Sequence, residues 1–210
     1  DQTLTEFTQG ITGVAANDGQ YTTGGVLQAD GRYVFEKDSS ITMTGGIPAV
    51  DVQGNVVIDA AGSSLTLKAD GDNNVYGISQ SSVNKAEITA DKVNIDVTSN
   101  SRAEGIHIMG SNKDQSADVV INGGLEANVK GSGYALGVYA GGNGSLTVNG
   151  NVIMKGTGEN KWGVDDSGNG YGYYGSSALY AGSNYGIQKG GTINVNGSVD
   201  LVVNGNGAFA

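Results

Sequence analysis

A ten-residue pattern of strand, tight corner and strand recurs five times in this chain, and it limits the possible folds more than any other feature. Its clearest copy is Leu146–Lys155 (LTVNGNVIMK), in which apolar and other residues alternate on both sides of the corner Asn149–Asn151. The other copies are Val50–Asp59, Ile88–Asp96 (one residue shorter), Val119–Asn128 and Ile193–Val202. Strict alternation is typical of a strand with one buried face. The repetition predicts an array of similar units.

The predicted inward positions are apolar in all five copies. The two positions before the corner hold Val50, Ile88, Val119, Leu146 and Ile193, then Val52, Ala90, Ile121, Val148 and Val195. The two positions after it hold Val56, Val93, Leu125, Val152 and Val199, then Ile58, Ile95, Ala127, Met154 and Leu201. Because this period of two stays in phase, each copy is expected to bury the same face.

Composition agrees with a chain of many corners and excludes several classes of protein. Glycine supplies 37 of the 210 residues and proline only 1, which suits turns that need a positive φ. The net charge of −10, with no basic cluster, argues against nucleic-acid binding. Cysteine is absent, so disulfides and thiolate metal sites are excluded. No apolar run approaches the length of a membrane span.

A second landmark, glycine followed by apolar residues, indicates the length of one unit. It occurs at Gly77, Gly105, Gly137 and Gly186, which are 28, 32 and 49 residues apart (105 − 77, 137 − 105 and 186 − 137). The last unit therefore carries an insertion, which we place near 158–177. Each unit holds three strand segments and no helical period. We predict a right-handed, single-stranded parallel β-helix with three strands per turn over 33–210, after a cap or irregular first turn at 1–32.

Antiparallel hairpins or a sandwich would give the same alternation around Asn-Gly corners. The parallel stack is favoured because one corner position keeps a similar polar chemistry in every unit: Gln53, Asp91, Asn122, Asn149 and Asn196. In stacked rungs these side chains would lie above one another, where amides can form a ladder. Isolated hairpins give no reason for that repetition.

Two runs, Gly133–Gly156 (GYALGVYAGGNGSLTVNGNVIMKG) and Ser176–Gly207, resemble the passenger regions of classical autotransporters, the type V secreted surface proteins of diderm bacteria. Those passengers form right-handed parallel β-helices similar to pectate lyases. The resemblance covers roughly Tyr33 to the end. Because Gly207–Ala210 matches Gly137–Ala140 and the family's membrane barrel is missing, we expect a fragment of a longer passenger.

The resemblance implies a non-enzymatic adhesin segment, without a cofactor, at the bacterial cell surface or secreted. Its partners would be receptors, protein or glycan, on host cells, matrix or other bacteria, and self-association along the rod is a further expectation. The alternative is a carbohydrate-active β-helix enzyme, a polysaccharide lyase or a glycosidase. Enzymes of this architecture use pairs of carboxylates. For a lyase, the resemblance also implies a basic residue that takes the proton next to a uronate, and acidic residues for calcium. Here Asp165-Asp166 is the only adjacent acidic pair, and no nucleophile motif is present.

Two groups of residues are candidates for binding. The insertion holds the only tryptophan, among Gly, Ser and Asn, a composition typical of recognition loops: Trp162, Tyr171, Tyr173 and Tyr174. These rings could equally cover the side of the solenoid. The second group is an outward row, predicted to be an exposed stripe, that contains the only histidine: Ser79, His107, Tyr139 and Gln188.

Three segments resemble calcium-binding loops in part, and each is interpreted as an ordinary turn. Asp165–Gly170 matches the start of an EF-hand loop, but Ser176 stands where the twelfth residue should be glutamate. Asp70–Asn74 is a weaker match of the same kind. Gly141–Gly144 begins like a nonapeptide calcium repeat and then lacks the required aspartate. The sequence therefore predicts no metal site.

Overall fold

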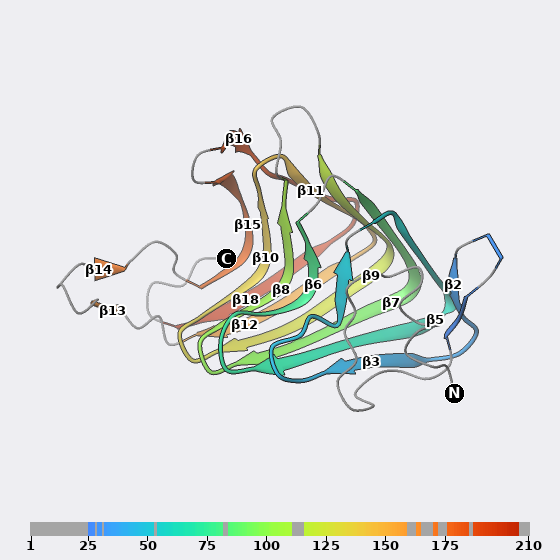
Figure 1. The fold of residues 1–210 in the computed structure, drawn as a ribbon, viewed down its shortest axis with the longest axis horizontal. Coiled ribbons are helices and arrows are strands. Elements are labelled where there is room, and N and C mark those ends of the chain that lie inside the picture. Colours follow the sequence, from blue (N-terminus) through green and yellow to red (C-terminus); the bar gives the residue numbers. More distant parts are fainter. Residues whose placement is uncertain are drawn as a thin grey trace.

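The computed structural model describes residues 25–27, 29–30, 32–52, 54–81, 84–110, 116–158, 163–164, 170–171, 176–184 and 187–205. All elements in this part of the chain are β-strands. They form a parallel β-solenoid of about four turns with two parallel sheets, seen along its axis in Figure 1. The predicted parallel β-helix is confirmed. No described segment is a helix long and apolar enough to cross a membrane.

The two sheets divide the strands of each turn between them. Sheet A contains β1 (Gly25–Leu27), β2 (Tyr33–Phe35), β3 (Ser39–Met43), β5 (Val56–Gly71), β7 (Lys85–Ser99), β9 (Ala117–Gly131), β11 (Gly144–Asn149), β12 (Val152–Gly158), β17 (Thr192–Val195) and β18 (Val199–Asn204). Sheet B contains β4 (Val50–Val52), β6 (Val75–Gln80), β8 (Arg102–Met109), β10 (Tyr134–Gly141), β15 (Ser177–Asn184) and β16 (Ile187–Gly190). A separate antiparallel pair consists of β13 (Gly163–Val164) and β14 (Gly170–Tyr171).

Sheet A has two arms that meet at the predicted corner. Strands β5, β7 and β9 each run through this corner without a break, with one register shift where they bend. In the next rung the same corner separates β11 from β12. Each long strand therefore supplies two of the three segments predicted per turn. Sheet B closes the third side (Figure 1).

The interior is filled by the side chains that alternation predicted to face inward. Ile121 of β9 and Val148 of β11 pair in register and are fully buried. The last described rung is less covered, because β17 pairs only with β11 and β18 only with β12 among the described strands. Its inward positions accordingly range from partly buried to 45% exposed at Val199: Ile193, Val195, Val199 and Leu201.

The register predicted for the first two copies is wrong. Val50–Val52 is a strand of sheet B, paired with β6, so the corner of that turn lies further on, at Gly62 with φ 79°. In the second copy, Ile88 pairs with Ile121 and not with Val119. Alternation reports which residues face inward but not which side of the turn they occupy. The sequence therefore could not distinguish an apolar segment of sheet B from the neighbouring segment of sheet A.

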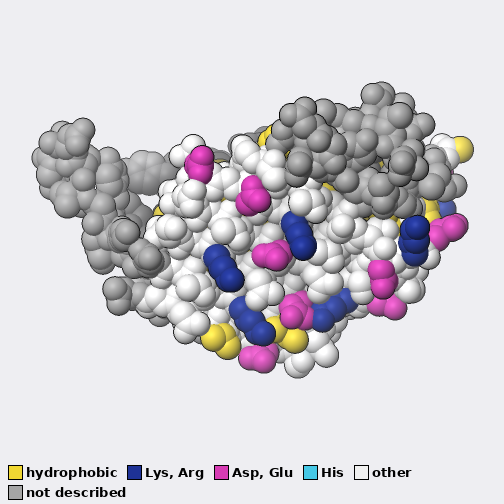
Figure 2. Space-filling model, turned by 90° about the horizontal axis from the view of Figure 1, so that it is seen from below, with side chains coloured by type: hydrophobic (Ala, Val, Ile, Leu, Met, Phe, Trp, Pro, Cys, Tyr) yellow, Lys and Arg dark blue, Asp and Glu magenta, His cyan; other side chains and the backbone are white. Residues whose placement is uncertain are grey.

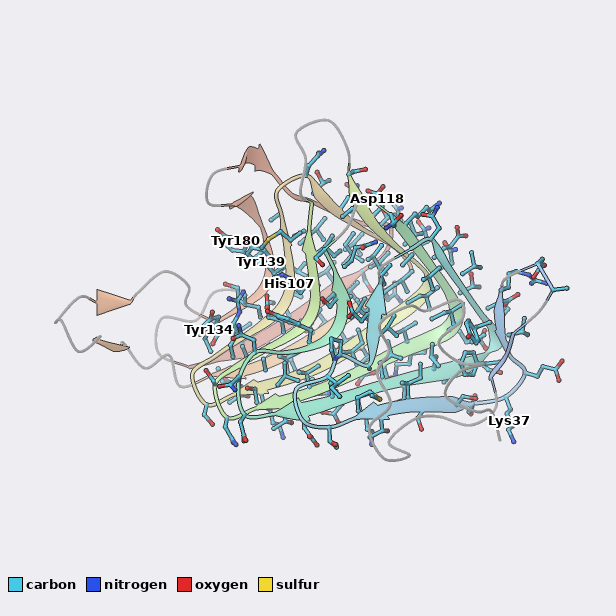
Figure 3. All side chains as sticks on the ribbon, in the orientation of Figure 1. Lys37, His107, Asp118, Tyr134, Tyr139 and Tyr180 are labelled. Atoms are coloured by element: carbon cyan, nitrogen blue, oxygen red, sulfur yellow. The ribbon has the colours of Figure 1, made fainter. Side chains whose placement is uncertain are left out.

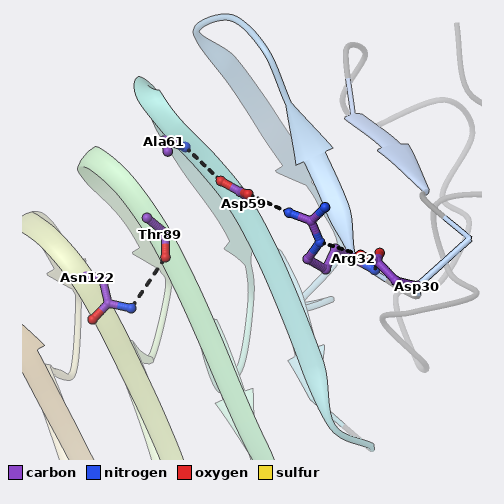
Figure 4. A network of polar contacts seen from close by, with 6 residues as sticks. All are labelled: Asp30, Arg32, Asp59, Ala61, Thr89 and Asn122. Carbon is purple, nitrogen blue, oxygen red and sulfur yellow. Dashed lines mark hydrogen bonds and ion pairs between the residues drawn. The ribbon is translucent and has the colours of Figure 1, made fainter.

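An amide ladder joins the corners of the last three rungs, as predicted. Nδ2 of Asn149 donates to Oδ1 of Asn122, and Nδ2 of Asn196 donates to Oδ1 of Asn149, both at 2.8 Å. Asn122 in turn donates to Oγ1 of Thr89 at 3.3 Å (Figure 4). Each bond links one rung to the next, so the ladder stabilises the stacking of corners along the axis.

The earlier rungs depart from the predicted ladder. Thr89 occupies the ladder position of β7, opposite Asn122, where Asp91 had been predicted. Asp91 lies at the bend, and its Oδ1 accepts a hydrogen bond from the backbone N–H of Gly62 at 3.0 Å. The predicted member Gln53 lies outside the described residues. The corner of β7 is one residue longer than that of β9, because Thr89 pairs with Asn122 and Lys92 pairs with Gly124, and this places Asp91 outside the column.

We expect Asn149→Ala to lower the free energy of unfolding by about 1 to 2 kcal/mol, because it removes both ladder bonds of this side chain, one to Asn122 and one from Asn196. Asn194→Ala is a suitable control, since Asn194 is exposed in β17 and its side chain has no hydrogen bond within the described part of the chain. Urea unfolding of the two variants measures the difference. Equal stabilities would show that the ladder adds nothing to stacking.

Candidate functional site

Sheet B bends at a column of glycines, one in each of three rungs. Gly77, Gly105 and Gly137 follow one another in register on β6, β8 and β10. A Cβ atom on Gly77 would lie 2.6 Å from the carbonyl oxygen of Gly105, and one on Gly105 would lie 2.5 Å from that of Gly137. Only glycine permits so close an approach between backbones. The bend then brings Glu104 and His107, on either side of Gly105, onto the same outer face.

The fourth glycine of this landmark was assigned wrongly. Val138 pairs with Leu179, so Ala178 occupies the column position in the next rung. Gly186 lies outside the described residues, and β16, the strand that follows it, runs antiparallel to β15. Glycine followed by an apolar residue is too short a pattern to distinguish a strand that stacks in parallel on the previous turn, such as β15, from an antiparallel strand such as β16.

Four aromatic rings stack in a column along the outer face of sheet B (Figure 3). The ring centroids of Tyr76 and His107 are 4.6 Å apart, those of His107 and Tyr139 are 5.2 Å apart, and those of Tyr139 and Tyr180 are 5.3 Å apart. The planes are inclined by 25° or less. Each contact joins neighbouring rungs, and such pairs stabilise by about 0.5 to 1.5 kcal/mol beyond their burial.

This column corrects the predicted exposed stripe. Ser79, His107 and Tyr139 do lie in one row. The next member of that row is Tyr180, not Gln188. The row is not exposed either, since the exposed fraction is 9% for His107 and 4% for Tyr139. Stacking covers the ring faces, which alternation along a single strand could not indicate.

A buried carboxylate lies beside the aromatic column. Glu104 is fully buried, and its Oε2 is 3.0 Å from Nε of Arg102 and 3.1 Å from Nδ1 of His107. The Arg102 contact is an ion pair whose angles do not form a hydrogen bond. Nδ1 of His107 also lies 3.2 Å from Oε1. A buried charge of this kind is costly to desolvate, and its two partners offset that cost.

The surroundings maintain the charge of Arg102 and the neutrality of two tyrosines. Burial lowers the pKa of Arg102, but its surroundings, with the Glu104 carboxylate first among them, raise the pKa overall. The guanidinium lies 5.1 Å from the ring centroid of Tyr134 and 5.9 Å from that of Tyr139, within cation–π range. Burial raises the pKa of Tyr76 and of Tyr134, and the negative charge of Glu104 adds to both shifts. Both phenols therefore remain hydrogen-bond donors at neutral pH.

The arrangement fixes one histidine tautomer. With Nδ1 against a carboxylate, the proton of a neutral His107 lies on Nδ1, and Nε2 is left as an acceptor. The Glu104 carboxylate and the ring faces of the column are occupied by contacts within the cluster. This ionic–aromatic cluster, defined by Tyr76, Arg102, Glu104, His107, Tyr134, Tyr139 and Tyr180, is the candidate site.

Sequence reasoning named two members of the cluster, His107 and Tyr139, and missed the others. A usable signal existed: the residue directly before each landmark glycine is Tyr76, Glu104 or Leu136, and these three lie in one row. Reading that row together with the row of His107 would have placed the carboxylate next to the imidazole. Arg102 and Tyr134, which also pair in register, open their strands and carried no periodic signal.

The predicted binding residues of the insertion lie largely outside the described part of the chain. This applies to Trp162, Tyr173 and Tyr174, whereas Tyr171 belongs to β14 and is described by its backbone alone. The segment begins and ends close to the cluster. A Cβ on Gly158 would lie 2.2 Å from Oγ of Ser176.

Ser176 ties this point to the body of the solenoid, because its Oγ accepts a hydrogen bond from the backbone N–H of Ala135 at 3.0 Å. Ala135 directly follows Tyr134 of the cluster. The insertion therefore leaves and rejoins the solenoid beside the cluster.

We expect Glu104→Gln to lower the free energy of unfolding by about 2 to 3 kcal/mol, since it removes the only acidic partner shown for the buried guanidinium of Arg102. Glu126→Gln is the matched control, because Glu126 pairs with Lys92 in a more exposed position, where such pairs contribute about 1 kcal/mol or less. Thermal unfolding compares them. If Glu104→Gln were as stable as the control, the buried pair would be dispensable.

Within the described residues, no group of three or more acidic or histidine side chains is placed to hold a metal ion. Comparison with known proteins gave no match to any family model, any curated protein or any solved structure.

Proposed function

We propose that this chain is a segment of a bacterial surface adhesin, similar to an autotransporter passenger. The solenoid would act as a stiff rod that presents binding groups to a receptor, protein or glycan, on host cells, matrix or other bacteria. The observation that carries the proposal is the position of the insertion, which is attached beside the ionic–aromatic cluster through Gly158 and Ser176. The sequence resemblance supports the family and the cell-surface location that we propose.

A binding role suits the chemistry of this region better than catalysis. The insertion concentrates Trp162 and several tyrosines, residues enriched at binding hot spots. The cluster beside its two ends is committed to internal contacts: Glu104 to Arg102 and His107, and each ring to its neighbours. Such a cluster makes a rigid base for a recognition segment, and rigidity lowers the entropic cost of binding.

Replacing residues 160–174 with a short Gly-Ser linker tests the proposal. We expect the free energy of unfolding to change by less than about 0.5 kcal/mol, because Gly158 and Ser176 are retained, and adhesion of coated beads to cells to fall about tenfold or more. Trp162→Ala alone should show part of the loss. Lys68→Ala, on the outer face of sheet A, serves as the control. Unchanged adhesion of the linker variant would remove the insertion from the binding site.

One observation favours a second candidate, a polysaccharide lyase. The contact of Nδ1 of His107 with Glu104 leaves Nε2 free of the tautomeric proton, as a general base requires. A lyase of this kind removes the proton next to a uronate carboxylate. Incubation with polygalacturonate, followed by the ultraviolet absorbance of the unsaturated product, distinguishes the two. Turnover that His107→Gln abolishes would establish the enzyme in place of the adhesin.

A further inference from the structure

A polar groove follows the turn between sheets A and B on the outside of the solenoid. It has a volume of about 860 Å³, and its sides carry hydroxyl, amide and ammonium groups: Thr98, Asn100, Lys130, Ser132, Thr157 and Asn204. It lies where β7 and β9 turn into β8 and β10. These turns are on the left of Figure 1. It is distinct from the ionic–aromatic cluster, none of whose residues line it.

The groove is periodic along the solenoid axis. Thr98, Lys130, Thr157 and Asn204 pair in succession on β7, β9, β12 and β18, so each of four neighbouring strands contributes one side chain to the same wall. Neighbouring strands are about 4.8 Å apart, and the wall is therefore roughly 14 Å long. A pyranose unit in an extended chain has nearly the length of one such step. The groove thus repeats at the spacing of a linear glycan.

Small residues keep the groove open. The base of the groove consists of three buried residues that pair in succession: Ser99, Gly131 and Gly158. A Cβ on Gly131 would lie 2.2 Å from the carbonyl oxygen of Tyr134, so a larger residue could not make this tight turn. The hollow is a consequence of how the chain turns at each rung.

The charge in the groove comes from one lysine. Lys130 is exposed and has no ion pair within the described residues, whereas Lys92 on the same face is paired with Glu126. Figure 2 shows basic and acidic side chains intermixed over the outer face of sheet A. A phosphate polymer needs clustered positive charge. A single ammonium among hydroxyls and amides suits a carboxylate on a largely uncharged, hydroxyl-rich chain.

We propose that this groove binds a linear acidic glycan, extended along the solenoid axis. A uronate carboxylate lies against Nζ of Lys130, and the sugar hydroxyls exchange hydrogen bonds with the neighbouring threonine and asparagine side chains of the wall. The charge-assisted bond to the carboxylate is the strongest single contact. The inference goes beyond the proposed attachment role and does not depend on the insertion.

Isothermal titration with a linear oligosaccharide of neutral sugars that carries one uronate and is long enough to span four strands tests this, with its uncharged counterpart of equal length as the second probe. We expect saturable binding of the acidic probe, about tenfold weaker binding to Lys130→Ala, and a smaller loss with Thr157→Val. Lys68→Ala, an exposed lysine of β5 outside the groove, should bind like the parent protein. Circular dichroism confirms that each variant is folded.

Three outcomes would overturn the inference: no saturable binding of the acidic probe, equal binding of the uncharged one, or unchanged affinity in Lys130→Ala. The linker variant of the insertion provides a further check. It should bind the uronate-bearing oligosaccharide as the parent does, even if it no longer attaches to cells.

Discussion

We expect Ile121→Asp to unfold the protein. Ile121 is fully buried in β9 and lies between Ile88 of β7 and Val148 of β11 in the stack. An aspartate there would place a carboxylate among apolar side chains with no partner shown, at a cost of several kcal/mol. That cost is comparable with the whole stability of an ordinary domain, about 5 to 15 kcal/mol. Circular dichroism and size-exclusion chromatography should show loss of the folded rod.

The matched control for this variant is Thr147→Asp. Thr147 is on β11, directly before Val148, and faces the other side of sheet A, where it is half-buried. Both variants add the same charge, so only the direction of the side chain differs between them. We expect Thr147→Asp to remain folded. A soluble Ile121→Asp variant that melts like the parent protein would show that the assigned register is wrong.

Gly105→Ala should cause the second large loss, about 4 kcal/mol or more of unfolding free energy. The new Cβ would lie 2.5 Å from the carbonyl oxygen of Gly137 and 3.3 Å from Cγ2 of Val129. The oxygen belongs to the backbone of the next rung and cannot rotate away, so the rungs must separate at the bend. The same movement would pull His107 away from Tyr139 of β10.

Gly54→Ala is the control, because a Cβ at Gly54 would meet no atom within 4 Å. Urea unfolding should give nearly parental stability for this variant and a much lower midpoint for Gly105→Ala. If the two alanine variants were equally stable, the column at the bend would not require glycine, and the close approach of rungs in sheet B would need revision.

Alternation in the sequence predicts which residues face inward, but it does not predict which sheet a strand belongs to. The inward positions of β9, β11 and β12 were predicted correctly, because a strand that buries one face repeats every two residues. The copies nearer the N-terminus were predicted in the wrong register. At Val50, for example, a strand of sheet B has the same alternation as a strand of sheet A. The asparagine ladder was found because identical side chains repeat at one corner. Thr89 was not recognised as a member of the ladder, because its side chain is a hydroxyl and not an amide.

The candidate site was largely hidden from the sequence. His107 and Tyr139 were predicted to share a row, and they do. Their burial depends on the bend at Gly105 and on rings contributed by neighbouring rungs, none of which a single strand reveals. Arg102 precedes His107 by five residues, and neither alternation nor spacing singled it out. The groove at Lys130 was likewise unpredictable, since small residues at a turn indicate a corner and not a hollow.

The amino-acid sequence alone determined that this chain stacks repeated strands around a shared apolar interior, because burying one face of each strand requires alternation that can be read residue by residue. Tertiary structure alone decided which polar groups meet. Contacts between rungs join residues about 30 positions apart, such as Tyr139 and His107, and their geometry depends on where each rung bends. The buried Glu104 and the open groove at Lys130 both follow from that bending.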